Sequence, residues 1–179
     1  YIELTNISGE RIDLSGWGLG TGRNPAIIPD GVILEKDSII IICGKQSVTH
    51  LQVYSRVWGI ERFPTLLNDG DTLILYDRDS AIHHAVSYNP IVMPAHKRDG
   101  GWSYELVDVK AACSILSNWI VSSNTLGGSP GIPNNPPVSI PDSKYFRLLH
   151  AYTLNSRNII MVFNDSVDTA SAKLKEKYI

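Results

Sequence analysis

The sequence predicts an all-β protein whose main body is an antiparallel β-sandwich. Short runs of β-branched and aromatic residues recur along the 179-residue chain, which is typical of strands. Turn-forming residues separate these runs at short intervals, and the chain lacks the strand–helix–strand alternation of parallel sheets. It also lacks a repeat of fixed period, which argues against a propeller or a solenoid.

The first part of the chain contains the expected centre of this fold. Residues 1–6 alternate apolar and polar side chains, and residues 11–14 resume the alternation after a turn, so we expect a hairpin. Residues 13–22 set two leucines and Trp17 among glycines, which favours a bent strand with a tryptophan in the core. Four successive isoleucines followed by a cysteine, residues 39–43, predict a central strand that is buried on both faces.

The middle of the chain contains one segment without a clear strand pattern. Residues 47–62 favour a helix or an irregular loop, because their apolar residues approximate helical spacing. Residues 72–76 and 81–88 form the clearest hairpin, joined by an Asp-rich turn. We also expect strands within residues 100–108 and 118–122, the second of which carries another core tryptophan.

Glycine and proline mark the expected end of the first domain, at residues 127–137. We therefore divide the chain into a sandwich at residues 1–135 and a second segment at residues 136–179. The second segment contains two expected strands, at residues 146–152 and 158–163. About forty residues cannot form a sandwich of about seven strands. We interpret this segment as a linker and the N-terminal fragment of a truncated second β domain.

The composition gives no indication of a nucleic-acid or membrane partner. The formal net charge is −2 at pH 7 and the basic residues are scattered, whereas phosphate binding needs clustered lysine and arginine. The longest apolar run has the length of a strand and falls far short of the ~20 residues of a membrane span. Tyr1 lies inside an expected strand, so we expect the natural N-terminus and any signal peptide to lie outside this chain.

The sequence contains no pattern of a catalytic, cofactor or metal site, so we predict a protein that is not an enzyme and holds no cofactor or metal. The acidic turns at residues 69–71 and 77–79 would lie ~20 Å apart at opposite ends of a strand, too far to share a calcium ion. We interpret each as a hairpin turn. His83 and His84 are neighbours on a strand and would point to opposite faces, one buried and one in solvent, so they cannot bind the same ion. The glycines that surround Trp17 miss the register of a dinucleotide-binding loop.

The cysteines and several aromatic residues leave alternatives open. Cys43 and Cys113 lack metal-type spacing and either form a disulfide, in an exported protein, or are two buried thiols. Five aromatic residues either pack in the core, the default in a sandwich, or line a carbohydrate-binding face. Trp58 is the best candidate among them for an exposed contact. The five residues are Tyr54, Trp58, Phe63, Trp102 and Tyr104.

Several motifs occur in one order and at matching intervals along the chain. They are Tyr-Ile-Glu-Leu-Thr-Asn at 1–6, Asp-Leu-Ser-Gly-Trp at 13–17, Pro-Asp-Gly at 29–31, Ile-Ile-Ile-Ile-Cys-Gly at 39–44, Leu-Asn-Asp-Gly-Asp-Thr-Leu-Ile-Leu-Tyr-Asp at 67–77 and Val-Ser-Tyr at 86–88. Over about residues 1–135 the sequence resembles the lamin tail domain family, in the type found in bacterial surface and secreted proteins. Residues 159–168 are similar to the first strands of bacterial immunoglobulin-like domains.

The resemblance implies an immunoglobulin-like β-sandwich in an exported bacterial protein, secreted or at the cell surface. It also implies a non-catalytic structural or interaction module, a monomer within a larger multidomain chain, which binds a protein or glycan partner through its loops. One alternative is an accessory domain of a secreted nuclease or other hydrolase whose catalytic domain lies outside this chain. Another alternative is a carbohydrate-binding module. The family supplies no catalytic residues to this sequence.

Overall fold

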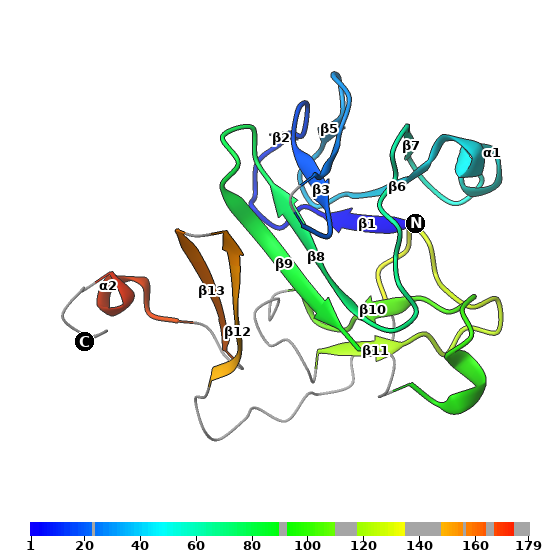
Figure 1. Cartoon of the computed structure of the whole chain (residues 1–179). Helices are drawn as coiled ribbons and strands as arrows, with labels where there is room; N and C mark the ends of the chain where they lie inside the picture. The colour runs from blue at the N-terminus through cyan, green and yellow to red at the C-terminus, as the bar shows by residue number, and fades with distance from the viewer. Residues whose placement is uncertain are drawn as a thin grey trace.

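The computed structural model describes residues 1–22, 24–89, 93–109, 118–134, 148–155, 157–163 and 167–173. Strands make up most of the regular structure in these residues, and the α-helices α1 (Val48–Leu51) and α2 (Thr169–Ala172) have four residues each (Figure 1). The predicted all-β class is therefore confirmed.

Strand β6 (Ile39–Gly44) is the centre of a three-stranded sheet in which it lies between β1 (Ile2–Thr5) and β7 (Val57–Ile60). All of its residues after Ile39 are buried, so the prediction of a central strand is confirmed. β1 runs antiparallel to β6, whereas β7 runs parallel to it. A parallel neighbour needs a crossover connection, which the 3-10 turn η1 (Lys45–Ser47) and α1 provide. The sandwich is thus not purely antiparallel.

The second large sheet has four strands in the order β4–β3–β8–β9. The predicted hairpin is confirmed, because β8 and β9 pair antiparallel with Leu73 opposite Val86. β3 joins this sheet through β8 on one side and β4 on the other. The bounds are β3 (Gly18–Gly20), β4 (Ala26–Ile27), β8 (Asp71–Tyr76) and β9 (Ile82–Tyr88).

The predicted hairpin between residues 1–6 and 11–14 is wrong. β1 pairs with β6, and β2 (Ile12–Asp13) pairs with β5 (Ile33–Leu34) instead. The side chain of Asn6 helps to keep β1 and β2 in different sheets. Its Nδ2 donates to the carbonyls of Glu10 at 2.6 Å and of Leu34 at 3.1 Å. Asn6 is almost fully buried, and its hydrogen bonds hold the chain where it leaves one sheet for the next.

The core lies between the two large sheets and consists of aliphatic side chains. Leu14 and Leu19, which flank the tryptophan in the sequence, are each only 1% exposed. Trp17 itself is partly buried and packs against the edge of this core, and Trp119 is also only partly buried, so the predicted core positions of the tryptophans need correction. The buried cluster comprises Ile2, Leu14, Leu19, Ala26, Ile28, Val32, Leu34, Ile40, Ile42 and Ile60.

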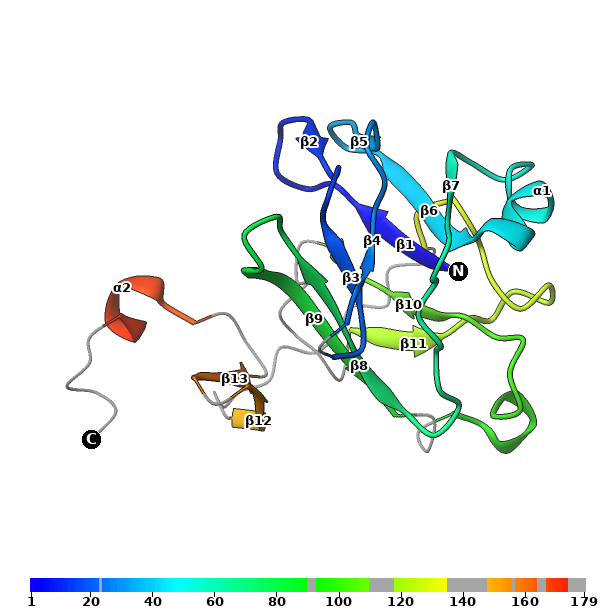
Figure 2. The same cartoon turned by 45° about the horizontal axis from the view of Figure 1, so that its top comes forward.

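Two further strand pairs complete the described structure. β10 (Tyr104–Leu106) pairs with β11 (Trp119–Val121), after the 3-10 turn η3 (Ala95–Lys97). β12 (Leu148–Asn155) pairs with β13 (Asn158–Phe163), which confirms the two strands expected in the second segment. This hairpin lies to one side of the main sheets in both views (Figures 1 and 2). The division near residue 135 stays a prediction, because residues 135–147 lie outside the described part.

Candidate interaction site

The candidate site is a shallow, open depression where two strand connections meet. It has a volume of about 270 Å³. One connection follows β2 and the other joins β8 to β9. The depression is lined by Asp13, Trp17, Asp77, Arg78 and Asp79.

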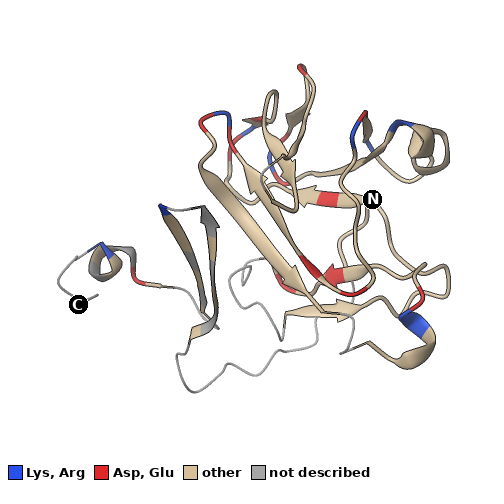
Figure 3. Cartoon of the chain, in the orientation of Figure 1, with Lys and Arg blue, Asp and Glu red and all other residues tan. Residues whose placement is uncertain are grey.

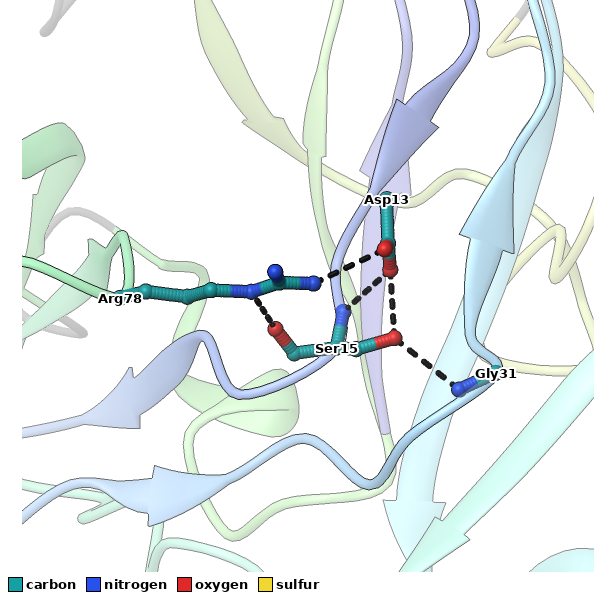
Figure 4. Close-up of polar contacts among 4 residues, drawn as sticks. All are labelled: Asp13, Ser15, Gly31 and Arg78. Carbon is teal, nitrogen blue, oxygen red and sulfur yellow. Dashed lines mark hydrogen bonds and ion pairs between the residues drawn. The ribbon is translucent and has the colours of Figure 1, made fainter.

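The first connection is held in shape by the carboxylate at the end of β2. Asp13 Oδ1 accepts the backbone N–H of Ser15 at 2.9 Å and also the Ser15 hydroxyl. The Ser15 Oγ accepts the N–H of Gly31 at 2.9 Å, which ties this turn to the Pro-Asp-Gly turn (Figure 4). Gly16 follows with a φ of +75°, a left-handed conformation that glycine adopts at little cost. The turn before Trp17 is therefore fixed by side-chain hydrogen bonds.

Arg78 joins the second connection to the first. Its Nη2 lies 2.8 Å from Asp13 Oδ2, and its Nε donates to the carbonyl oxygen of Ser15 (Figure 4). The stem of Arg78 runs beside Gly16, where a Cβ atom would lie 3.5 Å from Arg78 Cγ. One arginine thus fixes the relative position of both connections.

The tip of the β8–β9 hairpin is an Asx turn, which confirms the interpretation of residues 77–79 as a hairpin turn. Asp77 Oδ1 accepts the N–H groups of Asp79 at 2.9 Å and Ala81 at 2.8 Å. The other oxygen of Asp77 lies 3.1 Å from His83 Nε2, and the His83 ring packs against Trp17 with centroids 4.5 Å apart. The hairpin tip therefore also supports the indole of Trp17.

The other acidic segment, residues 69–71, also forms a turn. Gly70 has a φ of +98° and donates its N–H to the carbonyl of Leu67 at 3.3 Å. Asp71 begins β8, at the end of that strand opposite to Asp77. In the part of the chain that the structure describes, no three His, Cys, Asp or Glu side chains gather as a metal ion would require.

The depression carries charges of both signs. Hydrogen bonds from Ser15, assisted by Arg78, lower the pKa of Asp13, and the Ala81 N–H, assisted by His83, lowers the pKa of Asp77. Both carboxylates are therefore ionised at neutral pH. Acidic and basic positions alternate at the β8–β9 tip (Figure 3). The surface can thus present hydrogen-bond acceptors, a guanidinium and an indole to a partner.

The structure corrects the prediction for the two histidines and locates Trp58. His83 and His84 are both exposed, so neither is the buried histidine that we expect from the sequence, although partial burial lowers the pKa of His84. Trp58 is partly exposed and packs against the core cluster, as Trp17 does, so an exposed contact through this ring stays a prediction. Trp58 belongs to β7, where it lies in register with the core residue Ile42 of β6.

The remaining aromatic candidates do not form a common exposed face. Lys97 Nζ lies 3.9 Å from the ring centroid of Trp102, which covers that ring with a cation–π contact. Tyr104 stacks on Trp119 with centroids 5.8 Å apart. Phe63 packs against the core, and Tyr54 alone of the five is exposed. Most of these five aromatic rings are therefore engaged in contacts within the protein.

Cys43 is a free thiol in the structure and is only 1% exposed. Burial raises the pKa of this thiol. Cys113 lies outside the described residues. A disulfide between Cys43 and Cys113 therefore stays a prediction.

Sequence reasoning missed two residues that build the depression. Ser15 and Arg78 received no role, although Asp13 and Ser15 stand at the i, i+2 spacing of an Asx turn. That spacing could have identified the fixed turn. The contact of Arg78 with this turn has no local signal, because 65 residues separate Arg78 from Asp13.

Comparison with known proteins adds no family to this description. No family model, curated protein or solved structure matches the chain. The resemblance to lamin tail domains stays a prediction from the sequence. Among the described residues, no helix has the length and apolar character needed to cross a membrane.

Proposed function

We propose that this chain is a non-catalytic structural and interaction module of an exported bacterial protein. Its sandwich is of the immunoglobulin-like, lamin-tail type, and it binds a protein partner through the depression between the β2–β3 and β8–β9 connections. The observation that carries this proposal is the double contact of Arg78 with Asp13 and Ser15, which holds both connections in one fixed surface. A surface that is ordered before binding loses less entropy when the partner arrives.

The residues of the depression suit a protein partner. Trp and Arg are enriched among the residues that dominate protein–protein binding energies, and Trp17 and Arg78 lie together here. The hollow is shallow and open, whereas small-molecule pockets bury most of their ligand. The mixed charges of Asp77, Arg78 and Asp79 provide the polar contacts that surround such a centre.

A glycan partner has less support from the aromatic side chains. Sugar stacking needs an open ring face, and Lys97 covers Trp102 while Trp119 covers Tyr104. The alternative of an accessory domain in a secreted hydrolase assigns the same binding role to this chain. The two proposals differ in the neighbouring domain, which the complete gene sequence identifies.

Site-specific photo-crosslinking tests the proposed surface in the cells that produce the protein. A photoreactive amino acid replaces Asp79, which is exposed at the rim of the depression, and in a matched control it replaces Lys36, which is exposed in the turn before β6. We expect a discrete protein adduct from position 79 that is absent from position 36 and is lost when Arg78→Ala is added. The same adducts from both positions, or no adduct from position 79, would contradict the proposal.

A further inference from the structure

A strap of eight residues, 127–134, binds across strands of two different sheets. It follows β11, and residue 134 is the last described residue before β12. The carbonyl of Gly127 accepts the N–H of Ser103 at 2.7 Å, and Asn134 Nδ2 donates to the carbonyl of Leu106 at 2.8 Å. The two ends of the strap are thus bound at the two ends of β10.

Close backbone contacts show how tightly the strap is docked. A Cβ atom on Gly127 would lie 2.1 Å from the carbonyl oxygen of Gly101, and one on Gly131 would lie 2.2 Å from Ser55 Cβ. Both positions leave no room for a side chain. Glycine is therefore required where the strap touches the body.

Two carboxylates from different sheets hold the middle of the strap. Glu105 of β10 accepts the N–H of Ser129 at 3.1 Å, and its Oε1 also lies 3.0 Å from the Ser129 hydroxyl. Glu3 of β1 accepts the N–H of Gly131. The strap consequently connects β1 to β10, with one glutamate at each contact.

The pKa of Glu3 responds to its surroundings, which include Glu105. Partial burial has the largest effect and raises the pKa of Glu3; the hydrogen bond from the Gly131 N–H lowers it, the charge of Glu105 raises it, and the α-amino group of Tyr1 lowers it. Burial raises the pKa of the Tyr1 hydroxyl most, a hydrogen bond with the Ser103 side chain lowers it, and the charges of Glu3, Glu105 and Tyr54 raise it further. Burial lowers the pKa of the α-amino group, and the charges of Cys43 and Glu3 act in the opposite direction. Ionisation of Glu3 thus adds a negative charge within electrostatic range of Glu105 and at a partly buried position.

We propose that the strap is a proton-dependent clasp, which docks most firmly when Glu3 is neutral and loosens when Glu3 and Glu105 are both ionised. In the neutral form Glu3 Oε1 still accepts the Gly131 N–H, because the proton can reside on Oε2. In the ionised form the hydrogen bond from the Gly131 N–H is stronger, but lost hydration and repulsion from Glu105 outweigh it, because the net direction of the Glu3 pKa is upward. The clasp would thereby set how firmly the chain is fixed to the body before it continues toward β12.

The direction of the pH effect follows from linkage. A carboxyl group whose pKa is raised in the folded state binds more protons folded than unfolded. Its contribution to stability is complete below the pKa that the group has in the unfolded state. This contribution is lost as the pH rises through the pKa of the group in the folded state. The docked strap should therefore be more stable in mild acid than at neutral pH.

Amide hydrogen exchange measured by NMR tests the clasp. We expect the protection of the Ser129 and Gly131 N–H groups, corrected for intrinsic exchange, to fall as the pH rises from about 4 to about 7, by up to about tenfold for each unit by which the pKa of Glu3 exceeds its unfolded value. Glu3→Gln should keep the acid-level protection throughout. Glu10→Gln, at an exposed turn position, should behave like the wild type. Protection that does not change with pH in the wild type, or that changes equally in Glu3→Gln, would overturn the proposal.

A second variant keeps the test informative if Glu3→Gln does not fold. Glu105→Gln removes the neighbouring charge but retains an oxygen that can accept the Ser129 hydrogen bonds. We expect the titration midpoint of the Glu3 carboxyl carbon, followed by NMR, to move to lower pH in this variant. An unchanged midpoint would show that the two carboxylates are not coupled and would also overturn the clasp.

Discussion

Arg78 Nη2 lies 2.8 Å from Asp13 Oδ2, so an ion pair joins the tip of the β8–β9 hairpin to the end of β2. Both side chains are about half exposed, and such a pair alone adds little stability. Its importance is geometric, because the same guanidinium also binds the carbonyl of Ser15. The contact therefore defines the shape of the depression more than it stabilises the fold.

Replacement of Arg78 should loosen the depression with a small loss of global stability. We expect Arg78→Ala to lower the free energy of unfolding by about 1 kcal/mol, since it removes one hydrogen bond to a carbonyl and one exposed ion pair. Urea denaturation measures this loss, and NMR chemical shifts should change at Ser15 and Gly16. Arg11→Ala, at an exposed position beside β2, is the matched control. Equal effects of the two substitutions would show that the Arg78 contacts are not formed in solution.

Acid should destabilise the β2–β3 turn through Asp13. Hydrogen bonds from Ser15 lower the pKa of Asp13 in the folded state. The contribution of Asp13 to stability is therefore present above its pKa in the unfolded state and is lost as the pH falls through its pKa in the folded state. We expect the free energy of unfolding to fall from about pH 4 downward and this slope to be smaller in Asp13→Asn. Asp30→Asn, at an exposed turn position, serves as the control. The same slope in Asp13→Asn and the wild type would contradict the assignment.

Local sequence patterns predicted the positions of the strands better than which strands pair with each other. The isoleucine run of β6 and the β8–β9 hairpin follow from β-branched residues and an Asp-rich turn, which act within a few residues. The pairing of Ile2 with Ile42 depends on contacts across forty residues of chain. Two nearby alternating segments looked like a hairpin because nothing local shows that buried Asn6 directs them into different sheets.

The candidate site was still harder to predict from the sequence. Asp13 and Trp17 were noticed, but the fixed surface exists only because Arg78 reaches them from a distant turn. The strand that contains Trp58 was missed for a similar reason. Its segment has no strand pattern of its own, and the strand forms because it lies parallel to β6 after the crossover through α1.

Trp17 should matter less to stability than its leucine neighbour. Leu14 is almost fully buried, so Leu14→Ala should cost about 3 kcal/mol through lost burial and a residual cavity. Trp17 lies at the edge of the core with its ring on His83, so Trp17→Ala should cost about 2 kcal/mol. Urea denaturation of both variants measures the difference. A larger loss for Trp17→Ala would place the indole deeper in the core than the structure does.

Two glycines with the same backbone conformation separate the cost of strain from the cost of close packing. Gly127 has a φ of +87° and Gly9 a φ of +83°, but only Gly127 has a backbone atom in the position that a Cβ would occupy. Gly9→Ala should therefore lose only the left-handed strain of about 1 kcal/mol. Gly127→Ala should lose about 3 kcal/mol, since the strap must also move away from Gly101. Thermal or urea unfolding gives both values, and hydrogen exchange at Ser129 should accelerate only in Gly127→Ala. Equal losses would mean that the strap is not docked on the body in solution, because the additional cost at Gly127 exists only while the strap is in contact with Gly101.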